Sequence, residues 1–338
     1  MKNKIITIGS LTFDLFVQPL RHEIVRRFSK EKVKQFLQFP FGEKIRTKNV
    51  HECFGGGAAN CAIGLKRLGL EAMPFGAVGN DSWAEGIFKN FAKENISSEY
   101  LQKVDEKTGF SVILNSFEGE RTVLAYAGAN HAIEKIDTKI LYSAEGIHLC
   151  HLSGKSKKIF SNIEKFFQKN PKKFLSFNPG KEQIEQGLKK FSKFLSVVDV
   201  LFLNLEEAEE FSGLIAKTLK GQMDLSPIFH QFFKHNFSGI INITNGRGGA
   251  YCCDGKDIYY CSANNNLPRV DTLGAGDAFA SAFSASIFKK KSLQKALEHA
   301  TLNAGNVVAN FGAQKGLLTE KEINSIIRGI KISKKKLK

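Results

Sequence analysis

The feature that most constrains the fold is an alternation of short apolar runs with longer amphipathic segments, repeated along most of the chain. The short runs are rich in β-branched residues and predict buried strands. The segments between them, about 10 to 15 residues long, have apolar positions three and four apart and predict helices. Because strands joined by helices pair in parallel, we expect an α/β fold, a three-layer α/β/α sandwich around a mostly parallel sheet.

The pattern assigns most of the chain to elements. Strands are expected at residues 4–9, 43–53, 73–78, 146–151, 173–177, 198–203 and 239–244. Helices are expected at residues 29–39, 55–68, 82–94 and 155–168, as two short helices up to 196, from 205 onward, and at 275–288, 292–310 and 319–328. Two hairpins are expected, residues 108–126 around Glu118-Gly119-Glu120 and residues 250–261 around Asp254-Gly255.

Two segments interrupt the alternation, roughly residues 13–52 and 107–126, and we expect them to form a small β-rich lid. The length of 338 residues fits one large α/β domain with such an appendage. We therefore expect one domain over residues 1–330, followed by a basic C-terminal tail at 331–338. An open lid sheet can pair edge to edge with a second copy, so a homodimer through the lid is expected.

The charge balance tests whether the chain binds nucleic acid. Lys and Arg outnumber Asp and Glu by 49 to 33, a formal net charge of +16. Five of these excess charges are lysines of residues 331–338, and the others are spread over several predicted helices. Only nine of the 49 basic residues are Arg, the residue best suited to bidentate recognition of bases and phosphates. We expect no nucleic-acid partner, although a regulatory or nucleic-acid-binding protein is kept as the alternative, which salt-sensitive binding would reveal.

The six cysteines show neither CxxC pairs nor a Cys/His spacing typical of zinc sites, and His148 and His151 lie in an apolar run around Cys150. Reduced thiols are the default for such a chain. The apolar run after Met1 is too short for the core of a signal peptide, and no stretch approaches ~18 apolar residues. We expect a cytoplasmic protein without a membrane partner.

The most informative motif is Asp271-Thr-Leu-Gly-Ala-Gly-Asp277, which precedes a helix rich in Ala and Ser. Gly274, Ala275 and Gly276 would present free N–H groups and the positive end of the helix dipole, which together form an anion cradle. A carboxylate at Asp277 could take a proton from a hydroxyl while the cradle holds the phosphate that the hydroxyl attacks. The competing interpretation makes Asp277 a helix-start acid worth about 1 kcal/mol and the glycines turn residues.

With the glycine run Gly55-Gly-Gly-Ala-Ala-Asn60 upstream, this motif resembles the two signatures of the PfkB, or ribokinase-like, carbohydrate kinases. The resemblance covers nearly the whole chain in the right order. It includes Asp14 after the first strand, Gly128-Ala-Asn130, Asn204-Leu-Glu-Glu207, Thr244-Asn-Gly-Arg-Gly-Gly249 and Gly312-Ala-Gln314.

The resemblance implies a role for each matching position. Asp277 would be the base that deprotonates the acceptor hydroxyl, and Gly274, Ala275 and Gly276 would form the anion hole for the transferring phosphoryl group. Sugar hydroxyls would bind Asp14, Gly56, Gly57 and Asn60, because glycines expose the backbone and Asp and Asn supply directional partners. Read without the resemblance, the glycine run is a strand-to-helix turn.

The resemblance also implies ATP, Mg2+ and a monovalent cation such as K+. Asn204 and Glu207 would help to hold Mg2+ and its waters, although Asn followed by Glu three residues later is equally a capping box. Thr244, Gly246 and Gly249 would contact the nucleotide phosphates, with Arg247 beside them. Asn303 and Asn306, on one helix face, would contact the adenine edge. The monovalent cation would bind near Asp271, Gly312 and Gly316.

The implied function is an ATP-dependent kinase that phosphorylates a hydroxyl of a small sugar of the ribose, fructose or 2-keto-3-deoxygluconate type. Ribokinases carry Lys where this chain has Gly57, so the sequence departs from them at the sugar site. Arg21, Arg26, Arg27, Arg46 and Arg121 lie in or beside the expected lid, where they would meet either an acidic sugar or solvent. A nucleoside or a sugar phosphate as acceptor stays open, because the fold does not fix the substrate.

Overall fold

The computed structural model describes residues 3–20, 23–28, 33–115, 121–219, 222–264, 266–326 and 332–337. These residues build a ten-stranded sheet in the order β18-β17-β16-β15-β12-β11-β10-β1-β6-β7. Along this order, neighbouring strands between β15 and β7 pair in parallel, and β16, β17 and β18 extend the sheet by antiparallel pairing. Their bounds are β1 (Lys4–Ile8), β6 (Glu71–Val78), β7 (Leu101–Lys103), β10 (Gly146–Leu149), β11 (Phe174–Phe177), β12 (Val200–Asn204), β15 (Ile240–Thr244), β16 (Ala250–Cys253), β17 (Asp257–Cys261) and β18 (Ile332–Lys336).

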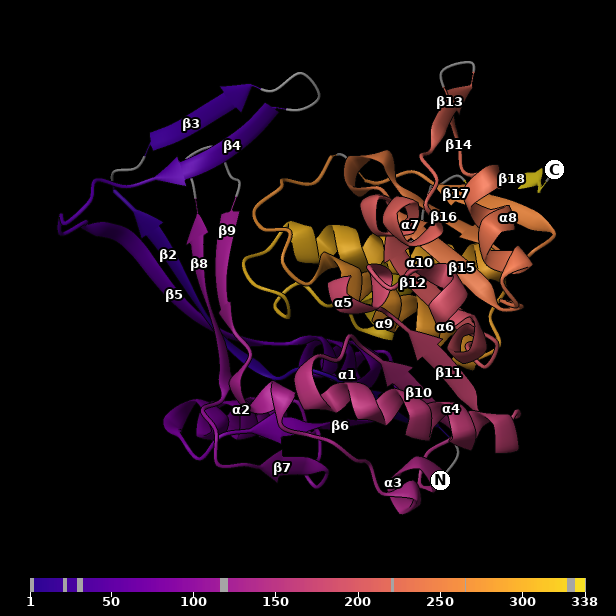
Figure 1. Ribbon diagram of the computed structural model, residues 1–338, viewed down its shortest axis with the longest axis horizontal. Coiled ribbons are helices and arrows are strands. Elements are labelled where there is room, and N and C mark those ends of the chain that lie inside the picture. The colour runs from indigo at the N-terminus through magenta and orange to yellow at the C-terminus, as the bar shows by residue number, and fades with distance from the viewer. Residues whose placement is uncertain are drawn as a thin grey trace.

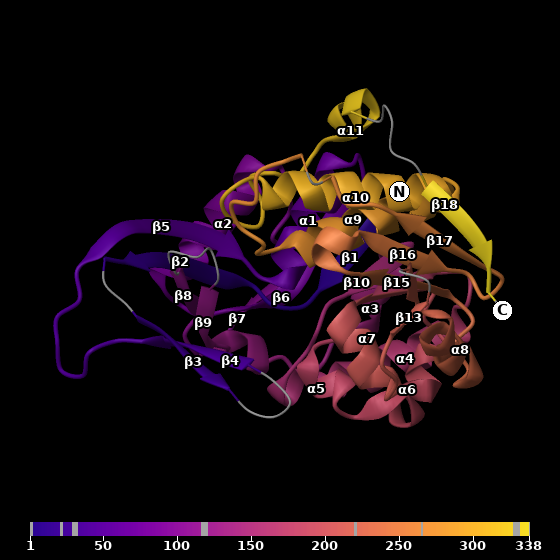
Figure 2. The same ribbon diagram turned by 90° about the horizontal axis from the view of Figure 1, so that it is seen from above.

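Helices cover both faces of this sheet, as Figure 2 shows from above. One layer holds α1 (Gly57–Arg67), α2 (Ser82–Lys93), α9 (Ala275–Phe288), α10 (Leu293–Val308) and α11 (Glu320–Ile326). The other holds α3 (Thr138–Tyr142), α4 (Ile159–Lys169), α5 (Lys181–Ile184), α6 (Gly187–Leu195), α7 (Leu205–Ser212) and α8 (Ser226–Lys234). The expected three-layer α/β/α sandwich is confirmed.

The central strands are apolar on both faces because each face packs against helices. In β1, Ile6 and Ile8 belong to the core beneath α4 and α6, whereas Ile5 belongs to the core beneath α1 and α9. All three side chains are essentially inaccessible to solvent. A strand buried on both faces reads as a continuous apolar run, which is the pattern that located β1 in the sequence.

Small residues let α9 pack closely against α1. A Cβ atom added to Gly64 of α1 would lie 2.3 Å from the hydroxyl oxygen of Ser281 on α9. Alanines and serines occupy most of the remaining buried face of α9, with Phe279 and Phe283 filling the space toward β12. This contact fixes the N-terminal end of α9 relative to the start of α1.

Both interruptions of the βα alternation contribute strands to a second sheet of four strands, in the order β5-β2-β8-β9. Its strands are β2 (Thr12–Pro19), β5 (Thr47–Gly55), β8 (Gly109–Asn115) and β9 (Arg121–Tyr126). Figure 1 shows this sheet projecting from one end of the sandwich. The predicted turn at Glu118-Gly119-Glu120 lies outside the described residues.

The helix expected at residues 29–39 is wrong. Residues 33–38 instead form β4 (Val33–Gln38), which pairs antiparallel with β3 (Glu23–Phe28). Val33, Phe36 and Leu37 fit a helical period, but a run this short fits a strand as well. Its partner in β3 is rich in β-branched residues, and cross-strand pairing decides the outcome.

The C-terminal residues 332–336, expected to be part of a basic tail, form β18 at the edge of the main sheet. Lys334 and Lys336 form ion pairs with Asp257 of the neighbouring strand, and Lys335 pairs with Asp224. Asp224 belongs to the small hairpin of β13 (Lys217–Leu219) and β14 (Gln222–Asp224). Lysines on an exposed edge strand discourage pairing with another chain.

Within the part of the chain that the structure describes, no helix is long and apolar enough to cross a membrane.

Candidate active site

The N-terminal end of α9 has the shape of an anion cradle. Gly274 precedes the helix with φ 73°, and its missing side chain lets the Ala313 loop approach closely, because an added Cβ would lie 2.3 Å from the Ala313 Cβ. The first intrahelical bond runs from the Ala278 N–H to the Gly274 carbonyl at 2.8 Å. The N–H groups before it have no acceptor within the helix. Open space surrounds the Cα of Gly276, so an anion could reach them.

Asp277 lies in the first turn of α9, beside this cradle. Burial raises the pKa of its carboxyl above the ordinary value, although the Asn60 hydrogen bond and nearby histidines act in the opposite direction. The Asn60 side-chain N–H donates to Oδ2 of Asp277 at 2.8 Å. A raised pKa makes the carboxylate a better proton acceptor, which is the property that a general base requires.

A chain of side-chain amides orients Asn60. Asn90 donates to Oε1 of Gln314 at 2.9 Å, Gln314 donates to Oδ1 of Asn60 at 3.0 Å, and Asn60 donates to Asp277. Arg67 holds the loop that carries Gln314 by donating to the carbonyls of Gln314 and Leu317. The sequence singled out Gly312-Ala-Gln314 but assigned no role to Gln314, and it missed Asn90.

The glycine run before α1 brings the backbone close to this carboxylate. Gly56 has φ 92°, and a Cβ there would lie 2.3 Å from the carbonyl oxygen of Ser10. The Gly57 N–H donates to the hydroxyl of Ser10 at 3.1 Å. A Cβ at Gly57 would lie 3.8 Å from Oδ1 of Asp277 and about 3 Å from Cys150. Gly57 therefore borders the catalytic candidate, and Cys150 fills the space that a longer side chain would need.

Asp14 lies on β2 of the projecting sheet and is buried. Burial raises the pKa of its carboxyl to about 6, against the lowering effect of hydrogen bonds from Ser111 and Thr12, and the charges of Asp271 and Asp277 raise it further. The carboxylates of Asp14 and Asp277 are thus close enough to influence one another, although Asp14 lies on a strand of the projecting sheet and Asp277 on helix α9. Asp14 borders the backbone of Gly55, because a Cβ there would lie 2.3 Å from Asp14.

A cavity of about 300 Å³ opens on the other side of the cradle. It is lined by Thr244, Gly246 and Gly249 at the end of β15, and by Ala275 and Gly276 at the start of α9. Arg247 also lines it. The sequence expected these two groups to bind phosphates, and the fold brings them to one cavity of the size that small-molecule sites have.

Asn303 and Asn306 do not line this cavity, which corrects the expectation that they contact a nucleotide base. Asn303 is fully buried, donating to the Ala278 carbonyl and accepting from the Leu318 N–H, and Asn306 donates to the Gly316 carbonyl. Both asparagines tie α10 to neighbouring backbone. The residues of α10 that do line the cavity are Thr301, Ala304, Gly305 and Val308. Their three- and four-residue spacing was readable in the sequence, but small apolar side chains gave no chemical signal.

Asn204 and Glu207 form a capping box at the start of α7. The Asn204 N–H donates to Oε2 of Glu207, and the Glu207 N–H donates to Oδ1 of Asn204, both at 2.8 Å. Burial raises the pKa of Glu207. Asn204 is the register partner of Thr244, so the capping box lies beside a residue that lines the cavity. The cap uses Oε2, and the second oxygen of Glu207 remains a suitable acceptor for a metal-bound water.

Asp271, Gly312 and Gly316 do not fit a monovalent cation as they are arranged. Arg121 of β9 donates to Oδ1 of Asp271 at 2.8 Å, the Leu273 N–H donates to the same oxygen, and the Gly312 N–H donates to Oδ2. The Gly316 carbonyl accepts from Asn306. A guanidinium already balances the carboxylate of Asp271, and the sequence could not decide where Arg121 points.

For the other lid arginines, the sequence left open whether they meet an acidic sugar or solvent. Arg26 and Arg46 are exposed, and the side chains of Arg21 and Arg27 lie outside the described residues.

Comparison with known proteins gives a family match and whole-chain relatives. The family model described as "pfkB family carbohydrate kinase" matches residues 22–320. A ribokinase of Staphylococcus aureus is 25% identical over 332 residues, covering 96% of this chain and 100% of its own. An ATP-dependent 6-phosphofructokinase of Thermoanaerobacterium thermosaccharolyticum is 25% identical over 281 residues, covering 79% and 83%. The solved ribokinase of Arabidopsis thaliana, complexed with ribose and ATP, has a TM-score of 0.77 at 21% identity and covers 97% and 100%.

Proposed function

The chain belongs to the pfkB family of carbohydrate kinases, which transfer phosphoryl groups to hydroxyls, and on this premise we propose that it phosphorylates a small uncharged sugar with ATP. The observation that carries the proposal is the position of Asp277. Asp277 directly follows Gly276, which lines the cavity, and its carboxyl bonds to Asn60. The same carboxyl lies near Gly57 and Asp14. A base between a phosphate site and a hydroxyl site is what phosphoryl transfer to an alcohol needs.

The proposed reaction assigns one task to each group. ATP lies in the cavity, with its phosphates toward Gly246, Gly249 and the start of α9. Asp14 accepts a hydrogen bond from one sugar hydroxyl, and Asn60 donates one to another. Together they hold the hydroxyl to be phosphorylated beside Asp277. Asp277 takes the proton of that hydroxyl. The sugar oxygen then attacks the γ-phosphorus of ATP in line, and ADP leaves. The N–H groups of Ala275 and Gly276 stabilise the charge that develops on the phosphoryl oxygens.

Mg2+ would be held through its waters by Glu207 and Asn204 together with the ATP phosphates. When bound, it would neutralise charge on the phosphates during transfer. The fit rests on two observations. The second oxygen of Glu207 has no hydrogen bond to a residue that the structure describes, and the capping partner Asn204 lies beside Thr244.

The acceptor side favours an uncharged substrate. Asp14 and Asp277 raise one another's cost of ionisation, and Asp271 adds a third carboxylate whose charge is balanced by Arg121. A phosphorylated or acidic sugar would meet net negative charge there, and like charges at close range oppose binding. Cys150 also fills the space at Gly57 that the lysine of ribokinases would occupy. The site is therefore not expected to bind ribose more tightly than other neutral sugars.

The test of this proposal is ADP release measured with MgATP across ribose, fructose, 2-keto-3-deoxygluconate, adenosine and sugar phosphates. We expect turnover with a neutral sugar and a kcat/KM for it well above that for any phosphorylated acceptor. Higher turnover with adenosine would move the chain to the nucleoside kinases of the same fold. Turnover only with a sugar phosphate, or only with 2-keto-3-deoxygluconate, which carries a carboxylate, would contradict the argument from the charges of Asp14 and Asp277.

Activity is expected not to depend on potassium, because Arg121 already supplies a positive charge at Asp271. Replacing K+ by tetramethylammonium at constant ionic strength should leave kcat unchanged in an ADP-release assay. Arg121→Gln removes the guanidinium and should make kcat respond to K+, since Asp271 then lacks a charged partner. Arg46→Gln, an exposed arginine near the same sheet, is the control. Several-fold activation of the unmodified enzyme by K+ would show that the cation binds despite Arg121.

Asp14→Asn is expected to weaken sugar binding and at the same time stabilise the fold at neutral pH. Loss of a charged hydrogen-bond acceptor should lower kcat/KM about 10- to 100-fold. The folded-state pKa of Asp14 is about 6, above the ordinary aspartate value of 3.8, so the stability that this group contributes is complete below pH 3.8 and lost as the pH rises through 6. Asparagine avoids that loss, so at pH 7.5 the free energy of unfolding should rise by about 2 to 3 kcal/mol.

Urea unfolding at several pH values measures this difference. The gain should shrink toward zero as the pH falls to 4, where Asp14 is protonated in both states. If the free energy of unfolding varied with pH in the same way for both proteins, burial would not raise the pKa of Asp14.

A homodimer through the projecting sheet is part of the proposal. Val123, Leu124 and Tyr126 of β9 are exposed by 42, 57 and 43%, and Val50 of β5 by 52%. β9 and β5 are the two opposite edges of this sheet, so each edge carries exposed apolar side chains through which a second copy could pair. Light scattering after size exclusion gives the mass in solution.

A further inference from the structure

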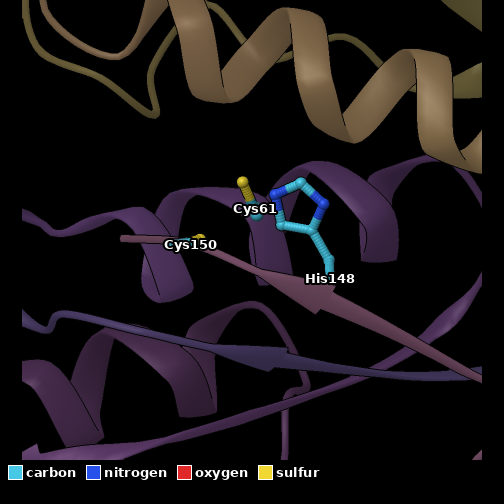
Figure 3. Close-up of side chains that lie close together, drawn as sticks. All are labelled: Cys61, His148 and Cys150. Atoms are coloured by element: carbon cyan, nitrogen blue, oxygen red, sulfur yellow. The ribbon is translucent and has the colours of Figure 1, made fainter. Parts of the chain in front are cut away.

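Two cysteines and a histidine meet directly behind the catalytic candidate. Cys61 comes from α1, His148 from β10, and Cys150 follows β10 by one residue. One ligand atom from each lies within 4.8 Å of the other two, and all three side chains are buried. Figure 3 shows the imidazole of His148 beside the sulfur of Cys61, with Cys150 on the adjoining strand end. The long separation of Cys61 from His148 in the sequence explains why no metal spacing was visible there.

The histidine of this cluster has a buried nitrogen without a partner. Nδ1 of His148 lies 2.8 Å from the hydroxyl of Ser176, and Nε2 makes no hydrogen bond to any described residue. Such unpaired buried nitrogens are rare, because leaving one unsatisfied costs free energy. If Nδ1 donates to Ser176, then Nε2 carries the lone pair of the neutral imidazole, which is the form that binds metals.

The two thiols would bind a metal as thiolates. Sulfur ligates metal ions in its deprotonated form, so binding to Cys61 and Cys150 would release one proton from each. The positive charge of the metal favours this loss.

We propose that Cys61, His148 and Cys150 form a binding site for Zn2+. Two thiolates and a neutral imidazole are ligands that zinc prefers, and with a divalent ion they give a site without net charge. Absence of net charge matters because an uncompensated ion would be strongly disfavoured at this depth. The three protein ligands leave the fourth tetrahedral position to a water or a small anion, as in sites that are not purely structural. Mg2+ is a poor candidate, because it requires oxygen ligands.

Occupancy of this site would act on Asp277. The Cys61 thiol lies 3.7 Å from the backbone carbonyl of Asp277, and Cys150 packs against Gly57. A bound zinc ion would draw the sulfur atoms of Cys61 and Cys150 toward it and away from these contacts. The backbone beside the Asp277 carboxyl would then shift. Zinc would then inhibit the kinase reversibly, a consequence that rests on the proposed function, whereas binding does not.

Binding is tested on the full-length reduced protein with Co2+ as a spectroscopic substitute for Zn2+. We expect one Co2+ per chain, with a thiolate-to-metal absorption band that Zn2+ abolishes by displacement. Cys61→Ser and His148→Gln should lose the band. Cys252→Ser, which removes a fully buried thiol from β16, should keep it and serves as the matched control.

The same proposal can be tested without substitutions, in case a variant does not fold. Equilibrium dialysis of the reduced, unmodified protein should retain one Zn2+ per chain, measured by atomic absorption, and a chelator should remove it.

Four outcomes overturn the proposal. Three concern the absorption band: no band with the unmodified protein, a band that survives Cys61→Ser, or a band that Cys252→Ser also loses. The fourth is a Cys61–Cys150 disulfide in the metal-free protein, seen as two missing thiols. Inhibition of ADP release by Zn2+ that Cys61→Ser relieves would support the link to Asp277. Binding without catalytic activity on any acceptor would leave the site intact and refute the kinase assignment of Asp277.

Discussion

Asp277→Asn is expected to lower kcat by about 10²- to 10⁴-fold with the preferred sugar and MgATP, the range that a general base contributes. Asparagine keeps the volume of the side chain and can still accept the Asn60 hydrogen bond, so the site should keep its shape. It cannot take the proton of the acceptor hydroxyl. The KM for ATP should change little, because binding does not need the carboxylate.

The control for this variant is Asp105→Asn, which changes an exposed carboxylate. Stability gives an independent check. Burial raises the pKa of Asp277, so removing its charge should not lower the free energy of unfolding at neutral pH. Near wild-type turnover in a folded Asp277→Asn protein would show that another group removes the proton.

Gly274→Ala is expected to lower kcat by about 10²- to 10³-fold, the effect of losing an anion-hole donor. The added methyl group would lie 2.3 Å from the Ala313 Cβ, and either α9 or the Ala313 loop has to move. That movement displaces the N–H groups of Ala275 and Gly276 from the phosphoryl group. Single-turnover measurements would locate the loss in the transfer step.

A matched glycine separates the clash from backbone strain. Gly187 has φ 74°, almost the value at Gly274, but nothing lies within 4 Å of an added Cβ. Gly187→Ala should show the strain of a left-handed alanine, about 1 kcal/mol, with normal turnover. Equal activities of the two alanine variants would contradict an anion hole at the start of α9.

The sequence predicted those parts of the molecule in which chemistry and local pattern coincide. The strands around β1 were readable because both of their faces are buried, and the start of α9 was readable because Gly274, Gly276 and Asp277 are unusual together. The fold then placed Asp277 beside Asn60 and beside the cavity at Gly246. Their functional roles are still proposals.

The missed parts depend on contacts between distant segments. Arg121 is an unremarkable strand residue until it meets Asp271, and Gln314 has meaning only between Asn90 and Asn60. Asn303 looked like a ligand-binding residue because it is polar on a helix face, but that face is buried against α9. The type of a residue and its helical period can be read from the sequence, but which face of the helix is covered by its neighbours cannot.

The edge position of β18 decides which backbone groups of the main sheet stay covered. Ile332–Lys336 pairs with β17, whereas Lys4–Ile8 lies in the interior of the sheet. Local opening of β18 alone would expose the unpaired backbone groups of β17 and leave the interior strands intact. The folded protein would then present an edge that can pair with a second copy. With β18 in place, its lysines would repel a second sheet from this edge.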